Sequence, residues 1–110
     1  MSLATGRIDL DLGHDHTLMF THWAPDRALN PQYDGLPDVP RIGATVCHLK
    51  PDGSPCASGI HFDSEVARRV FPGQTGWTVE SWEPLTVSPS LLCLRCGDHG
   101  FIREGKWVPA

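Results

Sequence analysis

Hydrophobic and polar residues alternate at the start of the chain. In residues 7–13 every second residue is aliphatic and the residues between are charged or glycine. This period of two is typical of a half-buried strand. Residues 16–23 form a second extended segment with Leu18 and Phe20 on one face, and Gly13-His14-Asp15 between the segments predicts a turn. We therefore expect an N-terminal hairpin over residues 7–23.

The next segment, residues 24–40, is rich in proline and cannot form a helix or a central strand. The signals Asn30-Pro31 and Asp34-Gly35 predict turns. We interpret the segment as an ordered surface loop rather than a linker, because it has apolar anchors at Trp23, Leu29, Tyr33 and Leu36.

Short strands separated by turns continue through residues 42–110. Two strands, 42–49 and 56–62, flank the turn Pro51-Asp52-Gly53. Asp63 or Ser64 is then placed to cap a helix over residues 65–71. Further strands are predicted at 77–82, 85–87 and 91–94, with a terminal hairpin over 101–108. The pattern predicts a mainly β single domain, residues 1–110, with one short helix and a zinc-ribbon-like β region over 42–110.

Composition agrees with a small, turn-rich domain. The chain has 110 residues, of which 11 are Gly and 10 are Pro, which favours short strands. Nine Lys and Arg against thirteen Asp and Glu give a net charge of −4, which disfavours a nucleic-acid binder. No apolar run approaches the roughly 20 residues that cross a bilayer. The first eleven residues lack the apolar stretch of a secretory signal, so we expect no export by such a signal.

The strongest chemical signal is Cys93-Leu94-Arg95-Cys96-Gly97. Two cysteines separated by two residues and followed by glycine form the knuckle of many zinc sites. The absence of an export signal also favours thiolate ligands or buried thiols over disulfides. A structural ion would add folding free energy that a small core lacks, on the order of 10 kcal/mol. We therefore predict structural Zn²⁺ at this knuckle.

The remaining ligands must come from residues elsewhere in the chain. The candidates are Cys47, His48, Cys56, His61 and His99. The first set we consider is Cys56, Cys93, Cys96 and His99. The second is the four-thiolate set Cys47, Cys56, Cys93 and Cys96, and His61 could replace either early cysteine.

A second group of histidines lies near the N-terminus. His14 and His16 flank Asp15, and His22 follows on the next strand. Such a group could hold a metal with an open position or supply a base, which is the basis for an alternative function as a metal-dependent hydrolase. No pattern here fixes a complete ligand set, so we interpret these residues as solvent-facing or satisfied core histidines.

The C-terminal half resembles a family of small uncharacterised proteins from phages and bacteria. The resemblance is carried by Pro89-Ser90, by Cys96-Gly97-Asp98-His99-Gly100-Phe101-Ile102 and by Gly105-Lys106-Trp107. In that family an earlier Cys-rich turn precedes a Cys-x-x-His motif, and Cys56-Ala57-Ser58-Gly59 would match that turn. The matching turn in this chain has a single cysteine, and Cys93 would replace the missing thiol. The family has no established activity to transfer, but the resemblance implies a phage origin.

No catalytic signature accompanies the predicted metal site, since the sequence has no phosphate loop, no nucleophile elbow and no His-Glu-x-x-His motif. These observations favour a non-enzymatic, zinc-stabilised module that binds a host or virion protein, located in the host cytoplasm or in the virion. A metal-dependent hydrolase that uses a His/Asp or a Cys/His metal site is the alternative, and a nucleic-acid-binding zinc ribbon is the third.

Overall fold

Short antiparallel strands make up most of the computed structural model, which describes residues 7–110. Within these residues nine strands form three sheets, accompanied by one α-helix and one 3-10 turn, which confirms the predicted mainly β class. The prediction that the chain has no secretory signal depends in part on residues 1–6, which lie outside the described residues. Among the described residues no helix is long and apolar enough to cross a bilayer.

A four-stranded sheet forms the first layer, in the order β1-β2-β3-β4. Its strands are β1 (Leu10–Gly13), β2 (His16–Trp23), β3 (Val39–Leu49) and β4 (Pro55–His61). The period of two places Leu18, Val46 and their neighbours on one face, which is buried. The predicted N-terminal hairpin is therefore continuous with the strands that follow, rather than a separate unit.

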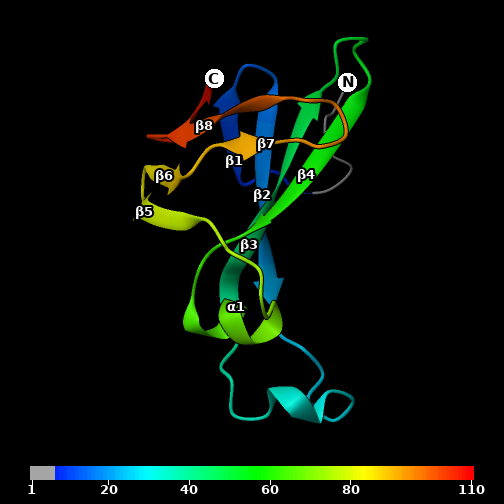
Figure 1. The fold of residues 1–110 in the computed structure, drawn as a ribbon, viewed down its shortest axis with the longest axis vertical. Helices are drawn as coiled ribbons and strands as arrows, with labels where there is room; N and C mark the ends of the chain where they lie inside the picture. Colours follow the sequence, from blue (N-terminus) through cyan, green and yellow to red (C-terminus); the bar gives the residue numbers. More distant parts are fainter. Residues whose placement is uncertain (1–6) are drawn as a thin grey trace.

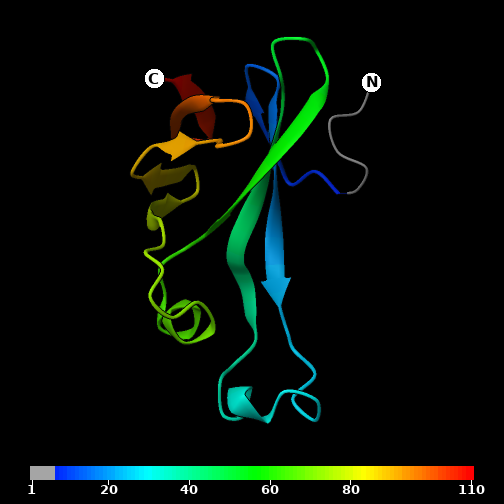
Figure 2. The ribbon, with the colours of Figure 1, turned by 45° about the vertical axis from the view of Figure 1, so that its right-hand side comes forward.

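Two smaller sheets cover the buried face. One pairs β5 (Thr78–Trp82) with β6 (Leu85–Ser88), and the other has the order β7-β8-β9, from β7 (Leu91–Leu92), β8 (His99–Arg103) and β9 (Lys106–Pro109). Figure 2 shows these C-terminal strands facing the upper part of the first sheet. The core between the layers includes Leu12, Leu18, Val46, Leu85, Val87, Ile102 and Trp107.

Strands β2 and β3 extend beyond the core as a long arm, visible at the bottom of Figure 1. Its tip is the proline-rich loop, which contains the 3-10 turn η1 (Pro31–Tyr33). The loop ends two residues earlier than predicted, because Val39 and Pro40 already belong to the inner strand β3. The loop is ordered as predicted, since Tyr33 packs edge-on against Trp23 and the Arg27 guanidinium donates to the Leu36 carbonyl at 2.7 Å. Leu29 is not an anchor, because 79% of it is exposed.

The helix α1 (Glu65–Val70) packs against the arm in a second, smaller core around Ile42, Val66 and Ala67. Ser64 is its N-cap, and its Oγ accepts the Ala67 N–H at 3.0 Å. The helix ends one residue earlier than predicted. The strand expected over 91–94 stops at Leu92, because Cys93 already belongs to the knuckle turn.

Candidate metal centre

The turn at residues 93–97 presents two sulfur atoms to the interior. It is closed by the Gly97 N–H, which donates to the Cys93 carbonyl at 2.7 Å. Gly97 has φ +80°, a left-handed conformation that a side chain would strain. Backbone N–H groups of Arg95 and Cys96 point at the Cys93 sulfur, and that of Asp98 points at Cys96. Donors aimed at sulfur favour the thiolate, which is the form that binds metal.

The hairpin of β3 and β4 supplies the other donors. Its turn is closed by the Lys50 N–H, which donates to the Ser54 carbonyl at 2.8 Å, and the pairing register places His48 directly opposite Cys56. Residues opposite each other in an antiparallel pair point to the same face. Both side chains therefore lie on the buried face, His48 at 1% exposure and Cys56 at 8%.

The four donor atoms of His48, Cys56, Cys93 and Cys96 lie within 4.8 Å of one another. The Cys56 and Cys93 sulfurs are 3.7 Å apart, and His48 Nε2 is 3.2 Å from the Cys96 sulfur. Around tetrahedral zinc, bonds of about 2.3 Å to sulfur and about 2.05 Å to nitrogen place two sulfurs about 3.8 Å apart and a nitrogen about 3.6 Å from a sulfur. The arrangement is compatible with a metal site, although the nitrogen–sulfur spacing is shorter than the ideal one.

The two knuckle thiols differ in acidity. Burial acts to raise the pKa of Cys93, but hydrogen bonds from the Arg95 and Cys96 N–H groups and from the Cys96 and Cys56 thiols lower it to about 6. At Cys96 the Asp98 N–H acts to lower the pKa, but burial and the neighbouring thiols outweigh it and raise the pKa above its usual value. Cys93 is therefore the first of the two to become a thiolate.

Three of the residues in the first predicted set come together, namely Cys56, Cys93 and Cys96. His99 is in neither potential metal-binding group of the described residues, and its Nε2 lies 2.9 Å from the Ser90 hydroxyl. The fourth donor is His48, a candidate ligand that belongs to neither of the two predicted sets.

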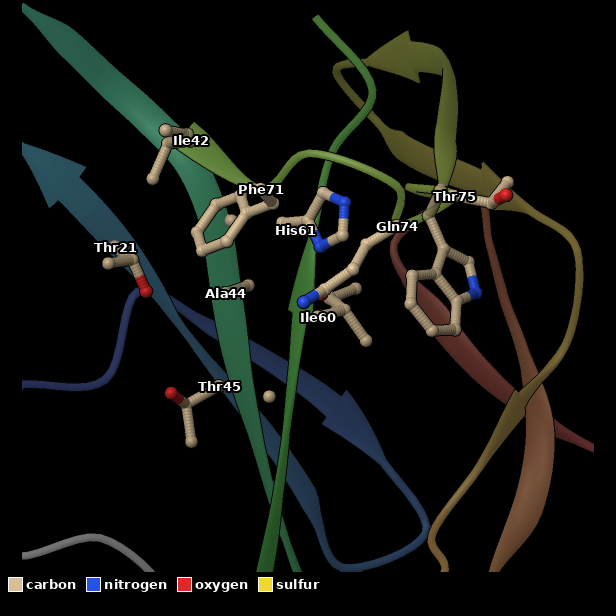
Figure 3. A pocket seen from close by; sticks show the side chains of 12 residues that line it. Thr21, Ile42, Ala44, Thr45, Ile60, His61, Phe71, Gln74 and Thr75 are labelled. Carbon is tan, nitrogen blue, oxygen red and sulfur yellow. The ribbon is translucent and has the colours of Figure 1, made fainter. Parts of the chain in front are cut away.

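The two alternates lie away from the cluster. Cys47 precedes His48 in the strand, so it points to the opposite face of the sheet. His61 stacks on Phe71 with ring centroids 4.7 Å apart, at a cavity of about 380 Å³ near the far end of β4. Figure 3 shows the two rings together, with Gln74 beside them.

The sequence contains a signal that identifies His48. A turn centred on Asp52 pairs residues whose numbers sum to 104, as in the observed pair Leu49 and Pro55. The same rule pairs His48 with Cys56, and it pairs Cys47 with Ala57. Register, rather than residue type, therefore selects the donor.

His16 lies beside the cluster on β2, next to His48 across the sheet, with ring centroids 5.4 Å apart. Its Nε2 lies 2.7 Å from an Asp98 carboxylate oxygen, and its other face stacks on Trp107 at 4.1 Å. Three neighbouring strands thus each contact the C-terminal segment: His16 contacts Asp98, His48 contacts Cys96, and Cys56 contacts Cys93.

The other members of the N-terminal histidine group do not come together as metal ligands. His14 and Asp15 form the tip of the β1–β2 turn with φ of +52° and +59°, and His22 is exposed. His16 alone is buried, at 5% exposure. A second potential metal-binding group, formed by His16, His48 and Asp98, shares His48 with the cluster. A cavity of about 530 Å³ borders His16, Cys96 and Asp98.

Comparisons with protein-family models, with curated proteins and with solved structures find no match.

Proposed function

We propose that the chain is a small protein-binding module whose fold is held by a structural Zn²⁺ bound to His48, Cys56, Cys93 and Cys96. The observation that supports it is the convergence of these four donors from two separate turns. One pair comes from the β3–β4 strands and the other from the knuckle, so each turn contributes half of the ligand set.

The donor set favours zinc as the ion. Thiolates and imidazole in a tetrahedral arrangement are the ligands of structural zinc sites. Four protein donors leave no position for water or substrate, whereas catalytic zinc keeps one open. The cluster is therefore suited to holding the fold together rather than to chemistry.

The ion would join the two layers of the molecule at one end of the core. Cys56 and Cys93 are separated by 37 residues in sequence. Both are buried, at 8% and 3% exposure, and neither is part of a disulfide. A structural zinc in a small domain contributes folding free energy on the order of 10 kcal/mol, which supplements a core of limited size.

The binding role is supported by exposed apolar side chains next to the knuckle. Leu92 is 53% exposed and Leu94, two residues later, is 91% exposed. Large exposed apolar residues mark interaction sites when they gather into patches. The resemblance to small phage and bacterial proteins suggests a host or virion protein as the partner.

A metal-dependent hydrolase is the second candidate, because the cavity beside the cluster is bordered by the His16–Asp98 pair. This function requires hydrolytic activity that disappears in the His16→Ala variant. Activity unchanged by this substitution would exclude this candidate.

The proposed function is tested by elemental analysis of the purified chain, followed by capture of partners from host lysate. We expect one zinc per chain in the parent and in Cys47→Ser, which leaves the cluster intact. Cys96→Ser should lose the zinc. A parent protein without zinc would overturn the structural half of the proposal, and one zinc with no captured partner would overturn the binding half.

A further inference from the structure

Strand β4 lies at one edge of the first sheet, and part of its backbone has no partner strand (Figure 1). In an antiparallel pair, hydrogen-bonded residue pairs alternate with pairs whose backbone groups point away from each other. The Phe62 N–H donates to the Ile42 carbonyl at 2.9 Å, which fixes this alternation along β3 and β4. The N–H and C=O groups of Ala57 and Gly59 therefore point away from β3, and no strand of residues 7–110 pairs with them.

The chain itself uses the same edge one step beyond Gly59. The Trp77 N–H donates to the His61 carbonyl at 2.9 Å, and the Asp63 N–H donates to the Trp77 carbonyl at 2.8 Å. These bonds form a single parallel bridge, after which the chain continues into β5. One residue of an added strand thus already lies on this edge, and the backbone beside Ala57 and Gly59 is left for a further strand.

The two edges of the first sheet differ in how they are protected. Native edge strands usually carry a bulge, a proline or charged side chains, which oppose pairing with another chain. The edge strand β1 has a bulge between Asp11 and Gly13. In β4 the register is continuous, no residue is Asp, Glu, Lys or Arg, and the one proline is its first residue, Pro55. The edge of β4 is therefore the one suited to receiving a partner strand.

A cavity of about 380 Å³ adjoins the unpaired part of this edge. The register places Thr45 opposite Gly59 and Gly43 opposite His61, so the two glycines leave a space on the sheet face away from the core. Figure 3 shows the His61 and Phe71 rings beside this space, with Thr45 across β3. Of the described residues that line the cavity, none is Asp, Glu, Lys or Arg. The cavity therefore suits an uncharged side chain.

The fold of the chain does not itself require glycine at position 59. Gly59 has no positive φ, and a Cβ there meets no atom within 4 Å, whereas a Cβ on Gly43 would collide with the Ile60 carbonyl. A glycine inside a strand that has no bulge often marks the close approach of a ligand or another backbone. Aromatic side chains on a neighbouring strand pack over edge glycines. Gly59 therefore indicates where an aromatic side chain of an added strand would lie.

We propose that β4 binds an extended segment of another protein as an added strand, with a large aromatic side chain of that segment beside Gly59 in the cavity. Ala57 and Gly59 would exchange backbone hydrogen bonds with the segment, and the aromatic ring would pack beside His61 and Phe71. In such strand addition the main-chain bonds supply affinity and the pocket selects the side chain. This inference rests on the proposed role as a protein-binding module and names the edge and the chemistry of the partner.

A second copy of this chain is a poorer occupant of the same edge. Pairing of two β4 strands would bring residues 55–61 of the copy to the cavity. The aromatic ring among them belongs to His61, which already stacks on Phe71. The residues of β4 that precede His61 on the same face are Pro55, Ala57 and Gly59, which are too small to fill the cavity.

The test measures the binding of labelled nine-residue peptides to the zinc-loaded full chain by fluorescence anisotropy. The first peptide has a central Phe with Val and Thr alternating on either side. A second peptide has Ala in place of Phe, and we expect it to bind about tenfold more weakly or less, because it lacks the buried ring. No binding of the Phe peptide, or equal binding of the Ala peptide, would overturn the proposal.

Two further peptides test whether binding uses the backbone. One carries N-methyl groups on Phe and every Thr, and the other carries them on every Val. An added strand directs the N–H groups of every second residue at its neighbour. We therefore expect one of the two methylated peptides to lose binding and the other to keep it. Binding that both peptides keep, or that both lose, would overturn the assignment of strand addition.

Variants of the chain locate the binding site. Ala57→Pro removes an N–H that points away from β3, which an edge strand tolerates, and Gly59→Val places a side chain in the cavity. Each should weaken binding of the Phe peptide about tenfold or more. Leu92→Val, at an exposed strand position of another sheet, is the control and should leave binding unchanged. Equal binding by the parent and Gly59→Val would overturn the assignment of the site, whether or not Ala57→Pro folds.

Three further measurements separate this inference from other readings. Zinc content and urea unfolding of each variant distinguish a lost binding site from a lost fold. A lysate partner captured equally by the parent and by Gly59→Val would overturn the β4 site and leave the proposed function in place. Sedimentation of the chain without peptide tests the second copy, and a dimer that Gly59→Val dissociates would overturn the choice of a segment from another protein.

Discussion

The Nε2 of His16 lies 2.7 Å from an Asp98 carboxylate oxygen, which connects β2 to the residue two positions after the last knuckle cysteine. The same Asp98 directs its backbone N–H at the Cys96 sulfur and accepts the Cys93 N–H on its carbonyl at 2.8 Å. Asp98 therefore links the first sheet to both knuckle cysteines without being a ligand in the proposed site. Groups that orient ligands in this way tune a metal site.

Substitution of this pair should weaken zinc binding without removing the site. Asp98→Asn and His16→Asn are each expected to lower zinc affinity about 10-fold to 100-fold, because the knuckle loses the contact that orients it. Competition with a chromophoric chelator measures the affinity. Asp15→Asn, at the tip of the neighbouring turn, is the control and should leave affinity unchanged. Equal affinities in all three variants would show that the pair does not orient the ligands.

His48 and His99 are distinguished by substitution. His48→Ala should lower zinc affinity more than about 100-fold, because orienting contacts alone account for about 10-fold to 100-fold. His99→Ala removes an exposed side chain that contacts Ser90 and should retain one zinc. Cobalt substitution gives an independent measurement, since the absorption of a tetrahedral thiolate complex should survive only in His99→Ala. The reverse pattern would restore His99 as the ligand.

The metal-free protein should become more stable as pH rises from about 6 to 9. The pKa of Cys93 is lowered from 9.0 to about 6 in the folded chain by the N–H groups around it, despite burial. A group whose pKa is depressed on folding contributes stability above its unfolded pKa and loses it as pH falls to the folded one. Urea unfolding at several pH values in the presence of chelator measures how the free energy of unfolding rises with pH. Cys93→Ser should reduce this rise, and a parent protein whose free energy of unfolding does not change between about pH 6 and 9 would contradict the expectation.

Two glycines on different strands should differ in how much their replacement by alanine lowers the free energy of unfolding. A Cβ on Gly100 would lie 2.6 Å from the Trp107 ring and 2.8 Å from the Val108 carbonyl, so the core must shift. We expect Gly100→Ala to lower the free energy of unfolding by about 1–3 kcal/mol. A Cβ on Gly59 meets no atom within 4 Å, so Gly59→Ala should be close to neutral. Equal stability of the two variants, measured by denaturant unfolding, would refute the close packing at Gly100.

Most of the fold could be predicted from alternation and turns. The period of two in residues 16–23 and the cap at Ser64 are local signals, and the structure contains both β2 and α1. Element ends were less predictable, because they depend on contacts from elsewhere. Trp77, for example, leaves the predicted strand to bridge to Phe62 and to donate its indole N–H to the Ser90 carbonyl.

The candidate site could be predicted in part. The Cys-x-x-Cys spacing fixes the knuckle locally, and proximity in sequence made His99 an attractive fourth donor. The pairing of β8 with β7 instead places His99 opposite Leu92, on the solvent-exposed side of that sheet. The contact between His16 and Asp98 joins residues that are 82 positions apart in the sequence. No local sequence pattern predicts a contact between residues so far apart.

The position of the four donors along the chain also constrains how the protein can be made. His48 and Cys56 meet as soon as one hairpin closes, but the proposed ion can gain its last ligands only when Cys93 and Cys96 have left the ribosome. Closure of the intervening loop then coincides with metal capture, and its entropic cost grows only slowly with loop length. A nascent chain halted before Cys93 would hold at most half of the coordination sphere, so full metal loading would report that the chain has been synthesised through Cys96.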